Sequence, residues 1–502
     1  MLGLCLVAVL VAVDQTVVGT ALPTVVAELQ GFELYAWVGS AYFLTAMVTV
    51  PIFGRLGDYH GRKPFVVASI IVFALGSIAC GLSQSMLQLV LARALQGIGG
   101  GMLLGTVFAC VPDLFPEPRV RLRWQVLLSA AYGIASGVGP TLGGFLTQAV
   151  GWRSVFFVNL PIGLMGLFVI WRYLPHIRQE SRPRVHLDWQ GAVLMALGLG
   201  CLQLFVELLP RHGLKLSVVV PGLAAALSVL ALLRWEQHSK EPLLPMSMLR
   251  DRSLATLFVL SLLAGGIMFV LLFYLPLMLQ GGFGMTPREV GLAITPLVVF
   301  ITIGSIINSR VLMHLPRPND MLYAGFGLLT LCTLGLIFTH RHTSGWLLSL
   351  IMTAGGLGLG FVMPNLTVFA QEVAGRALLG ISTAMLQSTR MIGGMLGMAL
   401  VGSVISHYYV GKVQGLVAGM EAADMLSVLE DPQLLVNLQS QASFVERVQA
   451  FAIDGLPLVE QAREFLVDAV HAGLLASLGI AIIAVIWVVR LPPIDLGAGR
   501  AS

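Results

Sequence analysis

Charged residues punctuate this chain, and the long stretches between them are almost entirely apolar. Charge-free runs lie, for example, within Lys63–Arg93, Arg123–Arg153 and Asp188–Glu207. A helix that crosses a bilayer needs about 20 apolar residues, because its backbone groups must form their hydrogen bonds within the segment. Runs of this kind along the whole chain predict an all-α polytopic membrane protein with about fourteen transmembrane helices.

The first apolar run begins at Leu2 and continues past Asp14 to Ala27. It has no basic segment in front of it and no evident small-residue cleavage site. We therefore interpret it as the first span and not as a signal peptide.

The positive charges are distributed unevenly over the predicted loops. When the N-terminus is placed in the cytoplasm, most of the 29 lysines and arginines fall in the inside loops. Cytoplasmic loops carry such an excess in membrane proteins. We expect both termini to be cytoplasmic, the number of spans to be even, and the location to be the cell inner membrane.

Composition excludes most other classes of protein. The chain is 57% hydrophobic and 11% charged, whereas a soluble domain is about 25% charged. The five cysteines lack metal-ligand or redox spacing, so we interpret them as packing residues. We find no nucleophile–base pair and no phosphate-binding loop. We therefore expect neither an enzyme nor an ATP-driven pump, no cofactor, no bound metal and no nucleic-acid partner.

One predicted outside loop is long, at about residues 408–465, and it is rich in acidic residues. It is predicted to contain amphipathic helical pieces. Two interpretations stay open: a solvated tether, or an element that docks over the outer mouth of the protein.

The segment between the second and third spans, Gly54 to Lys63, reads GRLGDYHGRK. It resembles the signature loop of the major facilitator superfamily, although that family usually has a basic residue at the position of Tyr59. Glycines permit a tight turn, and an acid at a helix end can pair with an arginine. Such pairs form in one state of a transporter and break in the other. The inner gate is predicted to comprise Gly54, Gly57, Asp58, Gly61, Arg62 and Lys63.

The first span contains a carboxylate, Asp14, in the sequence DQTVVGTALP. This resembles the first span of the fourteen-span drug:proton antiporters, with Gly19 where asparagine is common. A charged group at mid-membrane is costly and usually functional, so Asp14 is a candidate proton carrier that could also pair with a cationic substrate. The alternative is a structural carboxylate satisfied by neighbouring hydroxyls.

The fourth span reads RALQGIGGG from Arg93 and is similar to a motif of the same family. An arginine cannot lose its proton, so a buried one must be paired or hydrated. The resemblance implies that Arg93 and Gln96 take part in proton coupling. The alternative is an arginine that donates to backbone carbonyls.

The fifth span resembles the motif that the superfamily associates with antiporters, and this favours export. Small residues let two helices approach closely, and proline loosens a helix. Glycine-rich packing without directional meaning is the alternative. The motif residues are Gly133, Gly139, Pro140, Gly143 and Gly144.

Two further polar residues are predicted within or near spans. Arg390 lies in STRMIGGMLG, which is also similar to the fourteen-span family, and it should face the protein interior. Glu207 lies near the outer end of the seventh predicted span. The simpler interpretation is an interfacial carboxylate, and the alternative is a role in proton coupling.

The resemblance covers nearly the whole chain and implies a division into three parts. Residues 1–175 correspond to a first six-helix bundle, residues 186–236 to two additional spans, and residues 253–490 to a second six-helix bundle. The implied function is proton-coupled multidrug efflux of hydrophobic or cationic small molecules by alternating access. A dedicated exporter of one metabolite, siderophore or lipid is the alternative. A functional monomer is implied, and an adaptor at the outer face stays open.

Overall fold

The structure is a computed structural model that describes residues 1–115, 118–175, 188–212, 215–239, 246–374, 379–418, 427–449 and 455–494. Throughout these ranges the regular elements are helices, and no strand occurs among them. The all-α prediction is confirmed.

Twelve helices within the described ranges are long and apolar enough to cross a membrane. A helix rises about 1.5 Å per residue, so about 20 residues span the hydrocarbon core of a bilayer. Two more long helices, α2 (Tyr35–His60) and α5 (Pro118–Ala149), run alongside but do not belong to that set. The count of about fourteen spans therefore stays a prediction.

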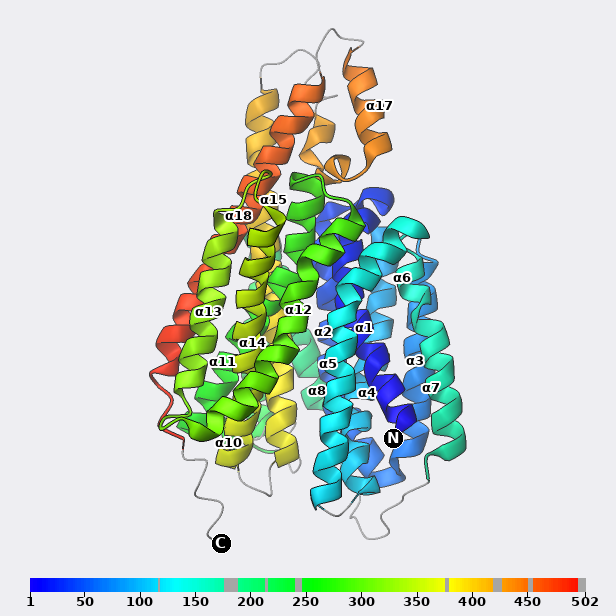
Figure 1. Ribbon diagram of the computed structural model, residues 1–502, viewed down its shortest axis with the longest axis vertical. Helices are drawn as coiled ribbons and strands as arrows, with labels where there is room; N and C mark the ends of the chain where they lie inside the picture. The colour runs from blue at the N-terminus through cyan, green and yellow to red at the C-terminus, as the bar shows by residue number, and fades with distance from the viewer. Residues whose placement is uncertain are drawn as a thin grey trace.

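The first group of helices packs mainly against itself, α1 against α5 and α7, and α4 against α2 and α3. Figure 1 shows this group in blue to teal. Besides α2 and α5, it consists of α1 (Leu2–Leu29), η1 (Phe32–Leu34), α3 (Arg62–Gly81), α4 (Met86–Leu114), α6 (Ser154–Phe157) and α7 (Asn159–Tyr173).

The second group packs α11 against α15, and α14 against α12 and α13, with α18 lying against α13 and α15. It consists of α10 (Met246–Arg250), α11 (Arg252–Leu277), η2 (Met278–Gly282), α12 (Pro287–Val311), η3 (Leu312–His314), α13 (Asp320–Ile337), α14 (Gly345–Ala374), α15 (Leu379–Val417) and α18 (Gly455–Val488).

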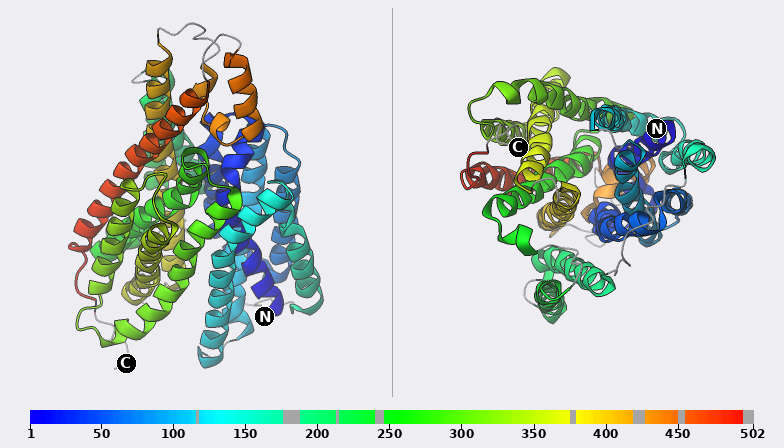
Figure 2. Two further views of the ribbon diagram at one scale, coloured as in Figure 1. Left: turned by 45° about the horizontal axis from the view of Figure 1, so that its top comes forward. Right: turned by 90° about the horizontal axis from the view of Figure 1, so that it is seen from below.

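Between the groups in sequence come α8 (Trp189–His212) and α9 (Leu216–Glu236), which pack against each other. Only α8 of this pair contacts both groups substantially, through α2 and α15. Seen along the helices, the pair stands to one side of the molecule (Figure 2).

The chain begins at the end of the molecule where α18 also ends (Figure 1). The opposite end carries what we call the cap, residues 427–449, with η5 (Ser427–Glu430), η6 (Pro432–Leu435) and α17 (Leu438–Gln449). The helices on either side extend toward it, α15 to Val417 and α18 from Gly455. Leu429, Leu435 and Phe444 of the cap are buried, and η6 packs on α1 and α18. The cap is therefore folded onto the helix ends.

The two groups meet along a seam formed by α5 with α12, α2 with α15, and α1 with α11. Near the cap, the Tyr35 hydroxyl donates to the Phe273 carbonyl at 2.6 Å. Close by, the Gln280 Nε2 donates to the Thr20 carbonyl at 2.7 Å. Toward the chain termini the ribbons of the two groups diverge (Figures 1 and 2). The halves are thus joined most closely at the cap end.

Candidate functional site

The carboxylate of Asp14 is buried inside the first group, with 1% of the residue exposed. Its position on α1 is twelve residues after Leu2, which places it about 18 Å along the helix. That depth is near the middle of a bilayer whose hydrocarbon core is about 30 Å thick.

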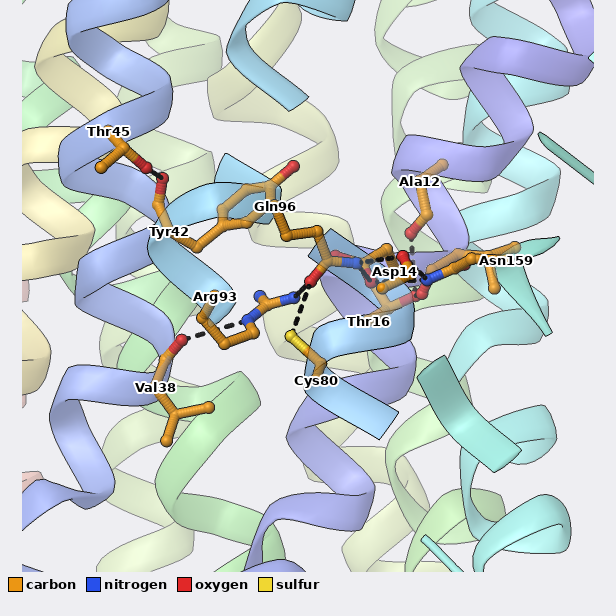
Figure 3. A network of polar contacts seen from close by, with 12 residues as sticks. Ala12, Asp14, Thr16, Val38, Tyr42, Thr45, Cys80, Arg93, Gln96 and Asn159 are labelled. Atoms are coloured by element: carbon orange, nitrogen blue, oxygen red, sulfur yellow. Dashed lines mark hydrogen bonds and ion pairs between the residues drawn. The ribbon is translucent and has the colours of Figure 1, made fainter. Parts of the chain in front are cut away.

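Three donors from two other helices surround this carboxylate (Figure 3). Arg93 Nη1 of α4 donates to Oδ2 at 2.9 Å. On the other oxygen, Oδ1, Gln96 Nε2 donates at 2.8 Å and Asn159 Nδ2 of α7 at 2.9 Å. An ionised carboxylate only accepts hydrogen bonds, so this arrangement is complementary to the deprotonated form.

The Arg93 guanidinium is held on several sides. Besides the ion pair with Asp14, its Nη1 donates to Gln96 Oε1 at 2.6 Å and its Nε to the Val38 carbonyl at 3.2 Å. Its central carbon lies 4.5 Å from the centre of the Tyr42 ring, a favourable cation–π geometry. The charge of Arg93 is therefore fully compensated inside the first group.

Glycines allow the helices to bring these side chains together. A Cβ at Gly76 would lie 2.5 Å from Gln96 Cα, and one at Gly97 would lie 2.4 Å from the Tyr42 carbonyl oxygen. Neither contact is possible for a larger residue without movement of backbone. The close approach of α3 and α2 to α4 follows from these small residues.

The structure brings the predicted proton-coupling residues Asp14, Arg93 and Gln96 into one network. It adds Asn159 and Ser77, whose hydroxyl accepts from Gln96 Nε2 at 2.8 Å. Sequence reasoning missed both. Asn159 had a usable signal, because it is the only amide in the apolar run between Arg153 and Arg172. The coupling role of the network stays a prediction.

The predicted inner gate forms a tight junction between α2 and α3. Gly61 alone separates the two helices and has a φ of 87°, a conformation that favours glycine. Arg62 forms an ion pair with Asp113 near the end of α4. These two residues and Lys63 line a small hollow. Gly57 is buried beside the Arg62 side chain.

Two predicted gate residues can be placed only along the chain. Gly54 and Asp58 lie on α2, but their side-chain environments fall outside the described part of the structure. The described pairing of this loop, through Arg62 and Asp113, stays within the first group. Asp113 was not among the predicted gate residues.

The antiporter motif on α5 faces two directions. Gly139 and Gly143 lie against Thr16 and Thr20 of α1. Gly144 instead faces the second group, where a Cβ would lie 2.2 Å from the Pro287 carbonyl oxygen of α12. The motif therefore forms part of the seam as well as part of the first group.

Two further members of the motif also contact α12. Gly133 lies opposite Thr302, and the Pro140 carbonyl lies against Gly291. Pro140 is inside α5. The hydroxyls of Thr141 and Thr295 form a hydrogen bond between the same two helices.

The remaining predicted polar residues lie away from the Asp14 network. Arg390 is on α15 in the second group and lines a separate hollow. Glu207 is on α8, and its side chain is outside the described part of the structure.

Comparison with known proteins agrees with this architecture. The family model described as "Major Facilitator Superfamily" matches residues 4–398. The chain belongs to this superfamily, and it is a multi-pass membrane transporter.

Several relatives are multidrug proteins by name. The chain is 30% identical to "Multidrug resistance protein 3" of Bacillus subtilis (strain 168), over 91% of this chain and 89% of that protein. It is 31% identical to "Multidrug transporter protein MdtP" of the same organism, over 98% of this chain and 92% of that one.

Solved structures support the fold alone. A bacterial homologue of the human lysosomal transporter Spinster, in an inward-facing and unoccupied conformation, has a TM-score of 0.66 at 15% identity. The match covers 97% of this chain and 95% of that chain.

Proposed function

We propose that this transporter is a proton-coupled multidrug efflux antiporter that exports hydrophobic or cationic small molecules by alternating access. The observation that carries the proposal is the buried Asp14 carboxylate, held by Arg93, Gln96 and Asn159 at mid-membrane depth. The names of the two Bacillus subtilis relatives support a multidrug role.

Proton binding would change this network in a defined way. A proton on Asp14 removes the negative charge and turns one acceptor oxygen into a donor. The ion pair with Arg93 is then lost, and the guanidinium keeps only Gln96, the Val38 carbonyl and the Tyr42 ring. Protonation therefore weakens the attachment of α1 to α4 and α7.

A change in α1 would reach the seam directly. Two and six residues after Asp14, Thr16 and Thr20 pack against Gly139 and Gly143 of α5. The Thr20 carbonyl also accepts a hydrogen bond from Gln280 of the second group. Loosening of α1 would thus alter the contacts that hold the two groups together at the cap end, as alternating access requires.

The proposal also includes the inner gate, the orientation of the chain and the energy source. The pair Arg62–Asp113 would hold the inner gate in one of its two states. Both termini would lie in the cytoplasm and the protein would act as a monomer in the cell inner membrane. The proton gradient supplies the free energy, so the proposal includes no cofactor.

The test uses purified protein in liposomes with an imposed pH gradient, with ethidium as the transported probe. Asp14→Asn preserves the shape of the side chain but cannot carry the proton, so gradient-driven transport should be abolished. Asp320→Asn, at an exposed helix start, is the matched control and should transport normally. Wild-type rates in Asp14→Asn would overturn the role assigned to that residue.

One observation favours a second candidate, the dedicated exporter of a single kind of molecule. The hollow at Arg390 is small and is lined by polar as well as apolar side chains, whereas a multidrug site is expected to be broad and apolar. Transport of ethidium would favour the multidrug candidate. Failure to transport it, with transport of another substrate intact, would favour the dedicated exporter.

A further inference from the structure

A hollow in the second group, outside the Asp14 network, is lined by three helices. It has room for about 30 Å³, enough for two or three water molecules. Its lining includes Ser261 of α11, Met363 and Leu366 of α14, and Leu386, Gln387 and Arg390 of α15. We propose that this hollow binds an anionic headgroup, a carboxylate in the first place, of an amphipathic exported molecule. This inference rests on the proposed export function, in the form of the dedicated exporter, because a site that prefers anions disfavours a cation such as ethidium.

The central observation is that the Arg390 guanidinium has no counterion among the residues that the structure describes. Its one described hydrogen bond is donated by Nη1 to the Met363 sulfur at 2.9 Å, and a thioether is a weak acceptor. Among the ion pairs between described residues, none involves Arg390. An arginine stays charged, and a charge without a partner inside a membrane protein is costly and points to a function.

The backbone around this arginine is fixed by close helix packing. A Cβ at Gly265 of α11 would lie 2.0 Å from the Arg390 carbonyl oxygen, and one at Gly393 would lie 1.8 Å from the Leu262 carbonyl oxygen. Helices α11 and α15 therefore touch backbone to backbone at this level. The arginine is held on a rigid support, as a preorganised binding group requires.

Arg390 lies within the part of α15 that is long and apolar enough to cross a membrane, Met385–Val417. It lies eleven residues after Leu379, the start of α15, or about 17 Å along the helix. Tyr132 of α5 lies near it across the seam. The Tyr132 hydroxyl in turn donates to Gln15 Oε1 at 2.7 Å, and Gln15 adjoins Asp14. The hollow is thus linked across the seam to the helix that bears the candidate proton carrier.

The charges around the hollow favour an anion over a cation. None of the described residues that line it is acidic, and the carboxylate of Asp14 is already paired with Arg93. Gln387 adds an amide that can donate, and an arginine fork binds carboxylate or phosphate through two parallel hydrogen bonds. Leu366 and Leu386 offer contacts to an apolar body, so the substrate should be amphipathic.

The experiment measures binding by fluorescence to purified protein in nanodiscs, without a pH gradient. Four probes carry the same dansyl-labelled alkyl chain and end in a carboxylate, a primary amide, a trimethylammonium or a phosphate monoester. We expect the wild type to bind the carboxylate at least about tenfold more tightly than the amide, and the ammonium most weakly. If the phosphate binds more tightly than the carboxylate, the anionic site stands and its headgroup is a phosphate.

Variants then assign the preference to one side chain. Arg390→Gln should bind carboxylate and amide equally, and Arg390→Lys should retain part of the difference. Arg341→Gln is the control, because Arg341 is half exposed and pairs with Glu460 at the surface. Size-exclusion chromatography shows which variants are folded. If Arg390→Gln does not fold, the comparison of carboxylate and amide binding by the wild type still tests the inference.

Two results would overturn the inference: equal affinity of the wild type for carboxylate and amide, or an undiminished carboxylate preference in Arg390→Gln. Both results can be distinguished from a failure of the proposed proton-coupled export. Proton-driven transport of ethidium without any carboxylate preference would refute the anion site alone. Carboxylate preference without proton-driven transport of any of the probes would refute the proton-coupled exporter.

Discussion

Each of the two groups of helices holds an arginine within a membrane-spanning helix, Arg93 in the first and Arg390 in the second. The groups that surround the two guanidinium groups differ. Arg93 has an acid, an amide, a carbonyl and an aromatic ring around its guanidinium. Arg390 has a methionine sulfur. Both arginines lie in apolar stretches of the sequence, so the difference between them comes from the side chains that pack around each guanidinium in the fold.

This difference suggests a division of labour between the groups. A charge that is neutralised within its own group can respond to a proton, because protonation of its partner changes the balance. A charge left without a counterion can respond to a ligand, because the ligand supplies the missing partner. The first group would then carry the proton step and the second the binding of substrate.

The largest expected effect tests this contrast through stability. Arg93→Met leaves the Asp14 carboxylate buried without its cation, which should lower the free energy of unfolding by about 3–5 kcal/mol. Arg390→Met removes a charge that has no counterion in the described part of the chain, so it should change stability by less than about 1 kcal/mol or increase it. Thermal melting of the two purified variants in the same detergent measures both.

A double variant separates charge from packing in this test. Asp14→Asn combined with Arg93→Met removes both charges, so it should recover a large part of the stability lost in Arg93→Met. Equal melting temperatures for Arg93→Met and Arg390→Met would show that the two arginines are not held differently, and the comparison would fail.

The sequence predicts one side of this contrast better than the other. Asp14 and Arg93 stand out because a charged residue in an apolar span is rare and must be satisfied. Their partner Asn159 is less conspicuous, since a neutral amide is less costly in a span. Nothing in the spacing along the chain indicates that α7 places this amide against Asp14, because that contact depends on how separate helices pack.

The fold follows from the sequence more completely than the site does. Apolar runs of spanning length predict the helices because the bilayer leaves the backbone few alternatives. The same rule does not reach the cap, where water can satisfy polar groups. The extension of α15 to Val417 and the burial of Leu435 on the helix ends depend on tertiary contacts that no local pattern encodes. The absence of a described counterion near Arg390 is likewise a property of packing.

A second prediction concerns the seam through which the two sites would communicate. A valine at Gly144 would clash with the Pro287 carbonyl of the second group, so Gly144→Val should destabilise the closed cap end by about 1–3 kcal/mol. Gly327→Val is the matched control, since a Cβ at Gly327 has no neighbour within 4 Å. Melting temperature and proton-driven transport are measured for both variants.

Gly144→Val should lower both quantities, while Gly327→Val should lower neither. If the valine at 144 is tolerated in both assays, the contact between α5 and α12 is not needed, and the two arginines need not be linked through this seam.

The smallest expected effect compares two carboxylates: buried Asp14, which pairs with an arginine, and the partly buried Asp431 of the cap, which forms no ion pair among the described residues. Burial raises the pKa of Asp431 from 3.8 to about 6, with a smaller contribution from the nearby Glu33, against hydrogen bonds from Gln433 that lower it. The docked cap thus binds a proton more tightly than the undocked cap. The stability that the proton provides is present below about pH 4 and is lost as the pH rises through about 6.

Hydrogen exchange of residues 427–449, corrected for intrinsic rates, measures this effect. Exchange should be slower at pH 5 than at pH 7.5, by an amount corresponding to about 1 kcal/mol once partial exposure is allowed for. Asp431→Asn should abolish the difference and keep exchange slow at both values, because a neutral side chain can stay docked. Glu446→Gln, at an exposed position on α17, should leave the pH dependence unchanged. If the exchange protection of the cap is the same at both pH values, partial burial without a cation does not make cap docking depend on pH. The difference between Asp431 and Asp14 would then come from the membrane surroundings of Asp14 and not from its arginine.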